Sequence, residues 1–139
     1  MSLEPIVVPG WKPAVGYSNG MRAPSGARML AIAGQVAWDA EQRLVGQGDF
    51  TVQFRQALAN VVEVLRAAGG KPEHLMQLTI FVTDKRLYSA STQQLGALWK
   101  VLIGRHYPAI ALVEVAALLE DGALIEIQGL AAIPATNGG

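Results

Sequence analysis

The chain has 139 residues, of which 51% are hydrophobic and 16% are charged, a balance that fits one globular domain and excludes a disordered tail. Eleven Lys and Arg residues against eleven Asp and Glu residues leave no formal net charge, so composition offers no electrostatic footprint for nucleic acid. The absence of Cys excludes disulfides, thiolate nucleophiles and Cys-ligated metals.

The N-terminal third predicts a loose end followed by a hairpin. Residues 1–13 show no clear periodicity, and we expect them, like residues 134–139, to be loosely held. They carry no basic segment followed by an apolar run, so we expect no secretory signal and a cytoplasmic protein. Residues 15–23 and 28–38 are short apolar segments separated by Pro-Ser-Gly, which predicts two strands joined by a tight turn.

A helix and a buried strand are predicted next. Residues 39–48 are polar and contain Gly, which indicates a loop. Apolar residues then recur at helical spacing until Gly69 and Gly70 end the helix; they are Phe54, Leu58, Val61, Val62 and Leu65. Residues 75–82 are nearly continuous in apolar side chains, as expected of a central strand covered on both faces.

The C-terminal half predicts one more helix and two strands. Asp84 can cap a helix whose apolar residues follow the i, i+3, i+4 pattern up to Pro108. Residues 109–118 and 123–133 are strands joined by an Asp-Gly step, which favours a hairpin turn. The most apolar run, residues 109–119, contains Glu114 and is shorter than the roughly 20 residues of a membrane span, so we expect no membrane partner.

The resulting order, ββαβαββ, predicts a single α+β domain over residues 1–139, with two helices on one face of a mixed sheet. In the last strand, a period of two places Leu124, Glu126, Gln128 and Leu130 on one face, and Ile125, Ile127 and Gly129 on the other. Both faces are mainly apolar. Because so small a chain covers its second face most simply with another copy of itself, we predict an obligate homo-oligomer.

Polar residues on these strands suggest either structure or a site. The side chains of Glu126 and Gln128 must either form hydrogen bonds within the protein or lie at a site accessible to water. They form either a hydrogen-bonded pair between subunits or part of a small pocket at the subunit interface, and periodicity leaves both open. Glu114 raises the same question, and for it we favour a structural pair with an arginine of a neighbour.

Three other candidates favour structural roles. Residues 16–20, Gly-Tyr-Ser-Asn-Gly, match the G-x-S-x-G nucleophile elbow, but a strand and turn follow them rather than a helix. His74 and His106 are the only histidines and have no third ligand at a recognisable spacing, so we expect no metal site. His74 fits a solvated connection, and His106 fits a polar cap at the end of the second helix.

Six segments of the chain occur in a distinctive order and spacing. They are residues 15–20 (Val-Gly-Tyr-Ser-Asn-Gly), 31–36 (Ala-Ile-Ala-Gly-Gln-Val), 54–69 with Gln-Ala-Leu-Ala-Asn-Val at 56–61, 79–84 (Thr-Ile-Phe-Val-Thr-Asp), 107–109 with 113–116 (Tyr-Pro-Ala and Val-Glu-Val-Ala), and 125–127 (Ile-Glu-Ile). Together they resemble the RidA family, also called YjgF or L-PSP. The resemblance implies a chorismate-mutase-like homotrimeric barrel with three ligand clefts between subunits and no cofactor.

The resemblance also implies a chemistry and a departure from it. The best-understood members hydrolyse reactive enamines and imines formed by amino-acid dehydratases, and release a 2-keto acid and ammonia. In these members, an arginine directly after Pro-Ala binds the substrate carboxylate. A glutamate on the last strand helps to position the attacking water. Here Ile110 and Gln128 stand at these places. Without the arginine, the protein loses a charge-assisted hydrogen bond of about 1.5–3 kcal/mol, which should weaken its binding of small imino acids. A glutamine in place of the glutamate cannot accept a proton as a carboxylate does.

The predicted site has two parts. Tyr17 and Gln128 are the candidate catalytic residues, which would orient substrate and water. The candidate substrate-binding residues are Ala33, Gly34, Gln93, Ile110, Ala111 and Glu126. Ala33 stands where the family often has serine, and Gln93 where it often has asparagine. Trp38 either offers a flat contact to the ligand or simply packs, and packing is favoured.

Three functions follow as hypotheses. The first is a diverged enamine or imine deaminase, whose ligand is less acidic, larger or more apolar than 2-iminopropionate. The second is a trimer of the same family that binds a metabolite or a partner without turnover. The third is ribonuclease activity with translation inhibition, which the family's older label suggests. The sequence disfavours it, because it has no basic stripe and no pair of histidines at catalytic spacing. Arg22, Arg28 or Arg105 could also enter the cleft in place of the missing guanidinium.

Overall fold

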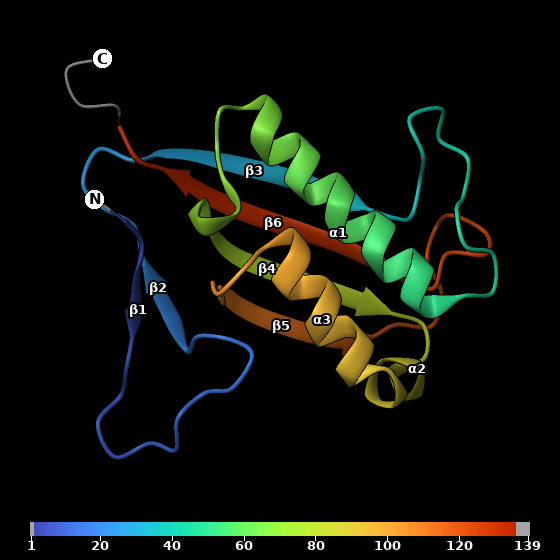
Figure 1. Cartoon of the computed structure of the whole chain (residues 1–139), viewed down its shortest axis with the longest axis horizontal. Coiled ribbons are helices and arrows are strands. Elements are labelled where there is room, and N and C mark those ends of the chain that lie inside the picture. Colours follow the sequence, from blue (N-terminus) through green and yellow to red (C-terminus); the bar gives the residue numbers. More distant parts are fainter. Residues whose placement is uncertain (1, 136–139) are drawn as a thin grey trace.

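The computed structural model describes residues 2–135, and these form a four-stranded sheet with helices on one face and a separate two-stranded ribbon (Figure 1). The strands are β1 (Glu4–Ile6), β2 (Gly20–Arg22), β3 (Arg28–Gln35), β4 (Leu75–Val82), β5 (Ala109–Glu114) and β6 (Ile125–Ile133). The helices are α1 (Phe50–Ala67), the 3₁₀ turn η1 (Pro72–His74), α2 (Lys85–Ala90) and α3 (Thr92–Leu102). The predicted α+β class is therefore confirmed.

The sheet is mixed and has the strand order β3-β6-β4-β5. β4 runs parallel to β5 and antiparallel to β6, while β6 runs antiparallel to β3. The prediction of a central strand at 75–82 is confirmed, since β4 has neighbours on both sides. Helix α1 crosses the sheet over β6 and β3, and α3 lies in front of β4 and β5 (Figure 1).

Helix α1 begins and ends at residues suited to those positions. The Asp49 side chain accepts a hydrogen bond from the Val52 backbone N–H at 3.2 Å, which satisfies one of the free donors of the first turn. After the last turn, Gly69 adopts a left-handed φ of +83°, which a residue with a Cβ rarely adopts. The predicted end of the helix at Gly69 is thus confirmed.

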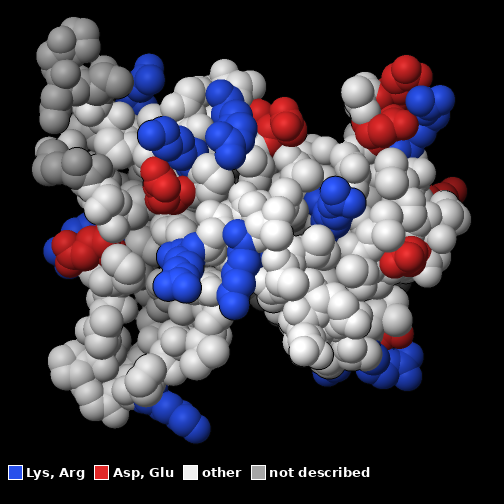
Figure 2. Space-filling model, in the orientation of Figure 1, with Lys and Arg blue, Asp and Glu red and all other residues white. Residues whose placement is uncertain are grey.

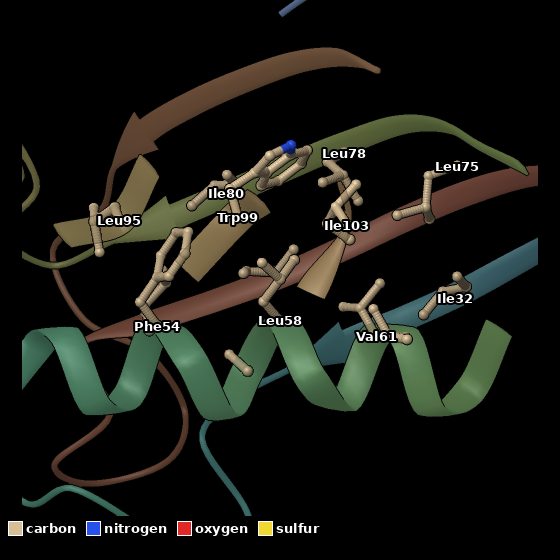
Figure 3. Packing of buried hydrophobic residues seen from close by; sticks show 14 of the residues in the cluster. Ile32, Phe54, Leu58, Val61, Leu75, Leu78, Ile80, Leu95, Trp99 and Ile103 are labelled. Atoms are coloured by element: carbon tan, nitrogen blue, oxygen red, sulfur yellow. The ribbon is translucent and has the colours of Figure 1, made fainter. Parts of the chain in front are cut away.

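The hydrophobic core lies between the helices and the sheet. Leu75, Leu78 and Val82 of β4 are fully buried, and the apolar stripe of α1 packs against them (Figure 3). In β6, Ile125 and Ile127 face this core while Glu126 and Gln128 face the other way, as the period of two predicts. Burial of these aliphatic side chains contributes about 1.5–3 kcal/mol each relative to exposure, and it holds the layers together.

The predictions of two hairpins are both wrong, because the strands pair with other partners. β2 pairs with β1 rather than with β3, so the first 13 residues contribute a strand instead of a loose end. β3 pairs instead with β6, from the far end of the chain. Apolar runs indicate that strands exist, but their partners depend on distant residues. Met1 and residues 136–139 lie outside the described residues.

The last two strands do not form the predicted hairpin either, because β4 lies between them. The turn itself is present: the Ala123 N–H donates to the Glu120 carbonyl at 3.1 Å, and Gly122 has a φ of +83°. β5 returns parallel to β4 after the helical crossover and takes one edge of β4. β6 therefore takes the other edge.

The predicted second helix is two consecutive helices. Asp84 caps α2 as expected, since its side chain accepts a hydrogen bond from the Arg86 backbone N–H at 3.0 Å. Ser91 then leaves the helical conformation, with a φ of −117° and a ψ of 11°, and α3 begins at the next residue. This break turns α3 so that Leu95 and Trp99 face the core.

Most of the sheet face away from the helices has no covering layer within residues 2–135, and we call it the open face (Figure 1). At one end of it, Leu3 and Met21 of the N-terminal segment pack on Ala132, which is fully buried. Met29 and Val113 on this face are 53% and 41% exposed. Gln77, Thr79 and Gln128 give its centre a polar character. No helix in the described residues is long and apolar enough to span a membrane.

Candidate functional site

A hollow of about 570 Å³ lies between α3, β5 and the N-terminal arm, which we define as residues 4–22. It is lined by Val15, Gly16, Tyr17, Phe54, Ile80, Tyr88, Thr92, Leu95, Gly96, Trp99, Lys100, Tyr107, Ile110 and Leu112. We call it the aromatic cavity. Its volume is within the range typical of small-molecule sites.

The floor of the aromatic cavity belongs to the hydrophobic core. Figure 3 shows Phe54, Ile80, Leu95 and Trp99 gathered at one end of the interface between α1 and the sheet, and each of them lines the cavity. Phe54, Ile80 and Leu95 are nearly fully buried. Because the core packs this floor from behind, the cavity has a fixed apolar base.

One end of the cavity is a rigid aromatic wall. The rings of Trp99 and Tyr107 stack with their centroids 6.2 Å apart and their planes 8° from parallel. The Trp99 Nε1–H donates to the His106 carbonyl at 3.0 Å, which fixes the indole. The side chain of His106 donates in turn from Nε2 to the Leu75 carbonyl at 2.6 Å, so it ties the end of α3 to β4, consistent with the structural role predicted for it.

Tyr17 reaches the cavity because the next residue fastens the arm to the body. The Ser18 hydroxyl donates to the Tyr107 carbonyl at 2.5 Å, and the Ser18 backbone N–H donates to the Pro108 carbonyl at 3.0 Å. The motif at 16–20 is therefore an anchor, with a strand after it, and not a nucleophile elbow. Tyr17 keeps 44% of its surface exposed and can contact a ligand.

Helix α3 presents a stripe of small and polar residues to the cavity. Thr92, Gly96 and Lys100 are spaced four residues apart, so they lie on one face of the helix. A Cβ built on Gly96 would meet nothing within 4 Å, so the hollow is open above it. The predicted Gln93 is exposed and does not line the cavity, although its neighbour Thr92 does.

Ile110 lies in the wall of the aromatic cavity beside Tyr17 and Leu112, so two of the predicted site residues share one hollow. Of the arginines considered as substitutes, Arg22 lies 3.7 Å from Glu4 in an exposed ion pair. Neither Arg28 nor Arg105 is among the described residues that line the cavity.

The predicted polar residues of β6 lie elsewhere, on the open face. Gln128 lines a shallow depression of about 260 Å³, together with Ala31, Ile32, Gln77, Thr79, Gly129 and Leu130. Thr79 lies between Gln128 and Ala111 in the strand register, so these three share one row across the sheet. Within one chain the structure therefore separates Gln128 and Ala111 from Tyr17 and Ile110.

Glu126 and Gly34 lie in contact on this same face. A Cβ built on Gly34 would lie 2.8 Å from the carboxylate carbon and from Oε2 of Glu126, so the absence of a side chain leaves space for the carboxylate. Ala33, next to Gly34, is exposed. Glu126 is only partly buried, and its carboxylate lies against the backbone of Gly34.

The remaining candidates have structural roles. Within the chain, Glu114 accepts a hydrogen bond from the Lys85 backbone N–H at 3.0 Å at the start of α2. Its pairing with an arginine of a neighbouring copy stays a prediction. Trp38 lies outside the aromatic cavity and its Nε1 is buried without a hydrogen-bond partner. No group of three or more His, Asp or Glu residues among residues 2–135 could hold a metal ion.

Sequence reasoning missed Tyr88, Thr92 and Lys100 as cavity residues. The spacing of residues 92, 96 and 100 indicates that Thr92 and Lys100 share one face of a helix. That face could be recognised as a cavity wall only after α3 was placed against β5, because Ile110 and Leu112 form the opposite wall.

The fold and the aromatic cavity define an α+β protein with a cavity of ligand size at the edge of its sheet. Residues 10–133 match the family model described as endoribonuclease L-PSP. The chain therefore belongs to the L-PSP family, which is the RidA family that the sequence motifs indicate.

Individual relatives agree with this family. A crystal structure of YyfB, a Rid-family protein from Yersinia pestis, is 36% identical, covers 96% of this chain and 100% of that one, and superposes with a TM-score of 0.83. A RutC family protein of Synechocystis is 34% identical over 86% of this chain and 88% of its own. The 2-iminobutanoate/2-iminopropanoate deaminase of Salmonella typhimurium is 32% identical over 74% and 78%, respectively.

Proposed function

We propose that this protein is an imine or enamine deaminase whose substrate is larger and more apolar than a simple 2-imino acid. The aromatic cavity carries the proposal, because it is a ligand-sized hollow with an apolar floor and with Ile110 in its wall. An isoleucine wall favours an apolar group and disfavours a desolvated carboxylate. The similarity to imine deaminases supports the reaction class.

The site would be completed between copies of the chain. Tyr17 and Ile110 lie beside β5, at one edge of the sheet, whereas Ala33 and Gly34 lie on β3, at the other edge. A ring of copies that places one chain's β5 edge against the next chain's β3 edge would bring the two groups together. Such a head-to-tail contact closes into a ring when its rotation fits, and a homotrimer is the ring that the family resemblance implies.

The chemistry requires orientation and one water molecule. Water adds through its oxygen to the imine carbon and one of its protons passes to the nitrogen, which gives a carbinolamine. The hydroxyl proton then also passes to the nitrogen as the C–N bond breaks, which leaves a carbonyl compound and ammonia. In this proposal the Tyr17 hydroxyl orients the substrate. Gln128 of a neighbouring copy orients the water through its side-chain amide, and no cofactor takes part.

Ammonia release tests the proposal. Imines are generated in place by an amino-acid oxidase acting on a series from alanine to leucine and phenylalanine, and hydrolysis is followed with and without this protein. We expect the acceleration over buffer to rise with the size of the apolar side chain. The absence of acceleration for every member of the series would contradict the proposal.

Substitutions at two positions relate the activity to the cavity. Gly96→Leu should abolish it, because the new side chain fills the open space above α3, while Gly96→Ala should retain it. Ile110→Arg should shift the preference towards the alanine-derived imine, since a guanidinium binds a carboxylate with two hydrogen bonds. Circular dichroism spectra and melting temperatures of all three variants check that the fold is intact.

A binding protein without turnover is the second candidate. The observation that favours it is that no Asp, Glu or His is among the described residues that line the aromatic cavity. A metabolite that raises the melting temperature and is recovered unchanged would favour this candidate. Measured turnover would exclude it as the whole function.

Ribonuclease activity is disfavoured by the distribution of charge. On the face shown in Figure 2, several basic side chains gather left of the centre with acidic side chains beside them, and the white surface between them leaves no continuous basic stripe. RNA cleavage that persists after repurification and disappears on replacement of Tyr17 or Gln128 would contradict this view.

A further inference from the structure

A single cationic side chain lines the aromatic cavity, and the proposed hydrolysis does not use it. Among the described lining residues, Lys100 is the only charged one. The chain as a whole carries no formal net charge, so a bound anion would gain little from the molecule as a whole. Within the described lining, Lys100 is therefore the one group whose charge can attract an anion.

Lys100 is linked to Tyr17 through the aromatic wall of the cavity. It directly follows Trp99, whose ring stacks on Tyr107. The Tyr107 carbonyl in turn accepts the hydroxyl of Ser18, next to Tyr17. Lys100, Tyr17 and Tyr107 all line the cavity, and the ammonium and phenol groups of such side chains are potential donors to a carboxylate.

The cavity extends along α3 for about two helical turns, from Lys100 to the uncharged Thr92. Thr92 and Lys100 are eight residues apart on α3, which corresponds to about 12 Å along the helix axis. Between them lie the apolar floor of Phe54 and Leu95 and the wall of Ile110. A three-carbon imino acid is much too short to use both ends.

We infer that Lys100 binds the carboxylate of the ligand, so that the substrate class is an acid with a branched or aromatic apolar side chain. The inference rests on the proposed function and refines it. The carboxylate would lie towards Lys100 and Tyr17, while the side chain covers Ile110 and the floor. A lysine suits this position because its long aliphatic stem packs on apolar surface and its ammonium group stays near water.

Binding of unreactive probes tests the inference without any need for turnover. Calorimetry compares 3-phenylpropionate with its neutral amide, 3-phenylpropanamide, on the wild-type protein and on variants. We expect the acid to bind about tenfold more tightly than the amide, as for a partly solvated charge-assisted hydrogen bond. Lys100→Gln should remove this preference by weakening binding of the acid about tenfold relative to the amide, whereas Lys100→Arg should retain it.

Two controls make the result specific. Lys71→Gln removes an exposed positive charge from the turn before β4, outside the cavity, and should leave the preference unchanged. Gly96→Leu should abolish binding of both probes. Equal affinities of acid and amide on the wild type, a preference that survives in Lys100→Gln, binding that survives in Gly96→Leu, or no binding of either probe would each overturn the inference.

The test is separable from that of the proposed function. A preference for the acid that depends on Lys100, together with no ammonia release from any imine, would refute the deaminase and support Lys100 as the anion-binding residue. Acceleration of imine hydrolysis that is unaffected in Lys100→Gln, with no preference for the acid probe, would support the deaminase and overturn the inference.

Discussion

At the scale of single residues, Gln53 joins helix α1 to two loops that are distant in the sequence, one before α1 and one before β6. It is a fully buried polar side chain on α1. Its Nε2 donates to the carbonyls of Gly46 and Gly122 at 3.1 and 3.0 Å, and its Oε1 accepts from the Leu124 N–H at 2.8 Å. One amide thus satisfies three backbone groups that would otherwise be buried without partners.

Gln53→Leu should therefore destabilise the protein by about 3 kcal/mol, because the substitution leaves these backbone groups without their partner. We expect a melting temperature lower by about 10 °C, measured by circular dichroism. Gln94→Leu, at an exposed position on α3, is the matched control and should change stability little. Equal effects of the two substitutions would contradict the role of Gln53.

His74 makes stability depend on pH. Its Nδ1 accepts a hydrogen bond from the Lys71 N–H at 3.0 Å, which requires an unprotonated nitrogen. Burial lowers the pKa of His74 below its usual value, with Lys71 and His106 acting in the same direction and Glu73 opposing them. The unfolded chain therefore takes up the proton more readily, and this contribution to stability is present above the usual pKa of about 6.5.

The free energy of unfolding should accordingly fall as the pH drops from 8 through the lowered pKa of His74. His74→Asn should reduce this slope, because an amide oxygen can accept the same hydrogen bond without titrating. Urea denaturation at a series of pH values measures both slopes, and His106 is present in both proteins. Identical slopes for the wild type and the variant would contradict this assignment.

At the scale of elements, two glycines without strained backbone differ in what surrounds them. On α3, nothing lies within 4 Å of a Cβ built on Gly96. On β6, a Cβ built on Gly129 would lie 2.8 Å from Cδ2 of Leu78, which is fully buried, and 3.2 Å from the Gln77 carbonyl oxygen. The central strand therefore approaches its neighbour more closely there than a methyl group allows.

Gly96→Ala should stabilise the protein by up to about 1 kcal/mol, since alanine favours a helix over glycine. Gly129→Ala should destabilise it by about 1–3 kcal/mol, because Leu78 has no free space to move into. Urea midpoints of the two variants check the opposite signs. A destabilised Gly96→Ala variant or a stabilised Gly129→Ala variant would show that the local packing differs from this description.

The elements also show how far the sequence could predict the fold. The ranges of α1 and β4 follow from local periodicity, and they agree with the structure because each pattern is contained in its own segment. The partners of β2 and β6 could not be predicted, since each pairs with a strand that is not its neighbour in the predicted hairpins.

For the site, the resemblance selected Tyr17 and Ile110, which share the aromatic cavity. It did not indicate Lys100, because nothing in the local pattern of α3 distinguishes a cavity wall from a solvated face. Whether Gln128 and Glu126 act with Tyr17 stays a prediction, because a single chain places them on the open face.

At the scale of the whole molecule, the open face should be an interface between copies of the chain. Its exposed apolar residues and its central row of Ala111, Thr79 and Gln128 have no covering layer within residues 2–135. A sheet that lacks a second layer on one side is stable when another subunit covers it. We expect the assembly to be the homotrimer that the proposed function requires.

Light scattering after size-exclusion chromatography should give three times the chain mass for the wild type. Thr79→Glu should dissociate the trimer, because it buries a charge at the centre of the interface. Val101→Glu, on the outer side of α3 where Val101 is 82% exposed, is the control and should leave the trimer intact. A monomeric wild type, or a trimer unaffected by Thr79→Glu, would contradict the prediction.

The position of β6 between β3 and β4 also determines when the protein can fold during its own synthesis. β3 and β4 emerge from the ribosome earlier, but neither is the hydrogen-bonding partner of the other. Until residues 125–133 have been made, the sheet consists of β3 alone and the pair formed by β4 and β5. Assembly of the sheet on the nascent chain must therefore wait for β6, and a growing chain that stops before it exposes the apolar surface of α1.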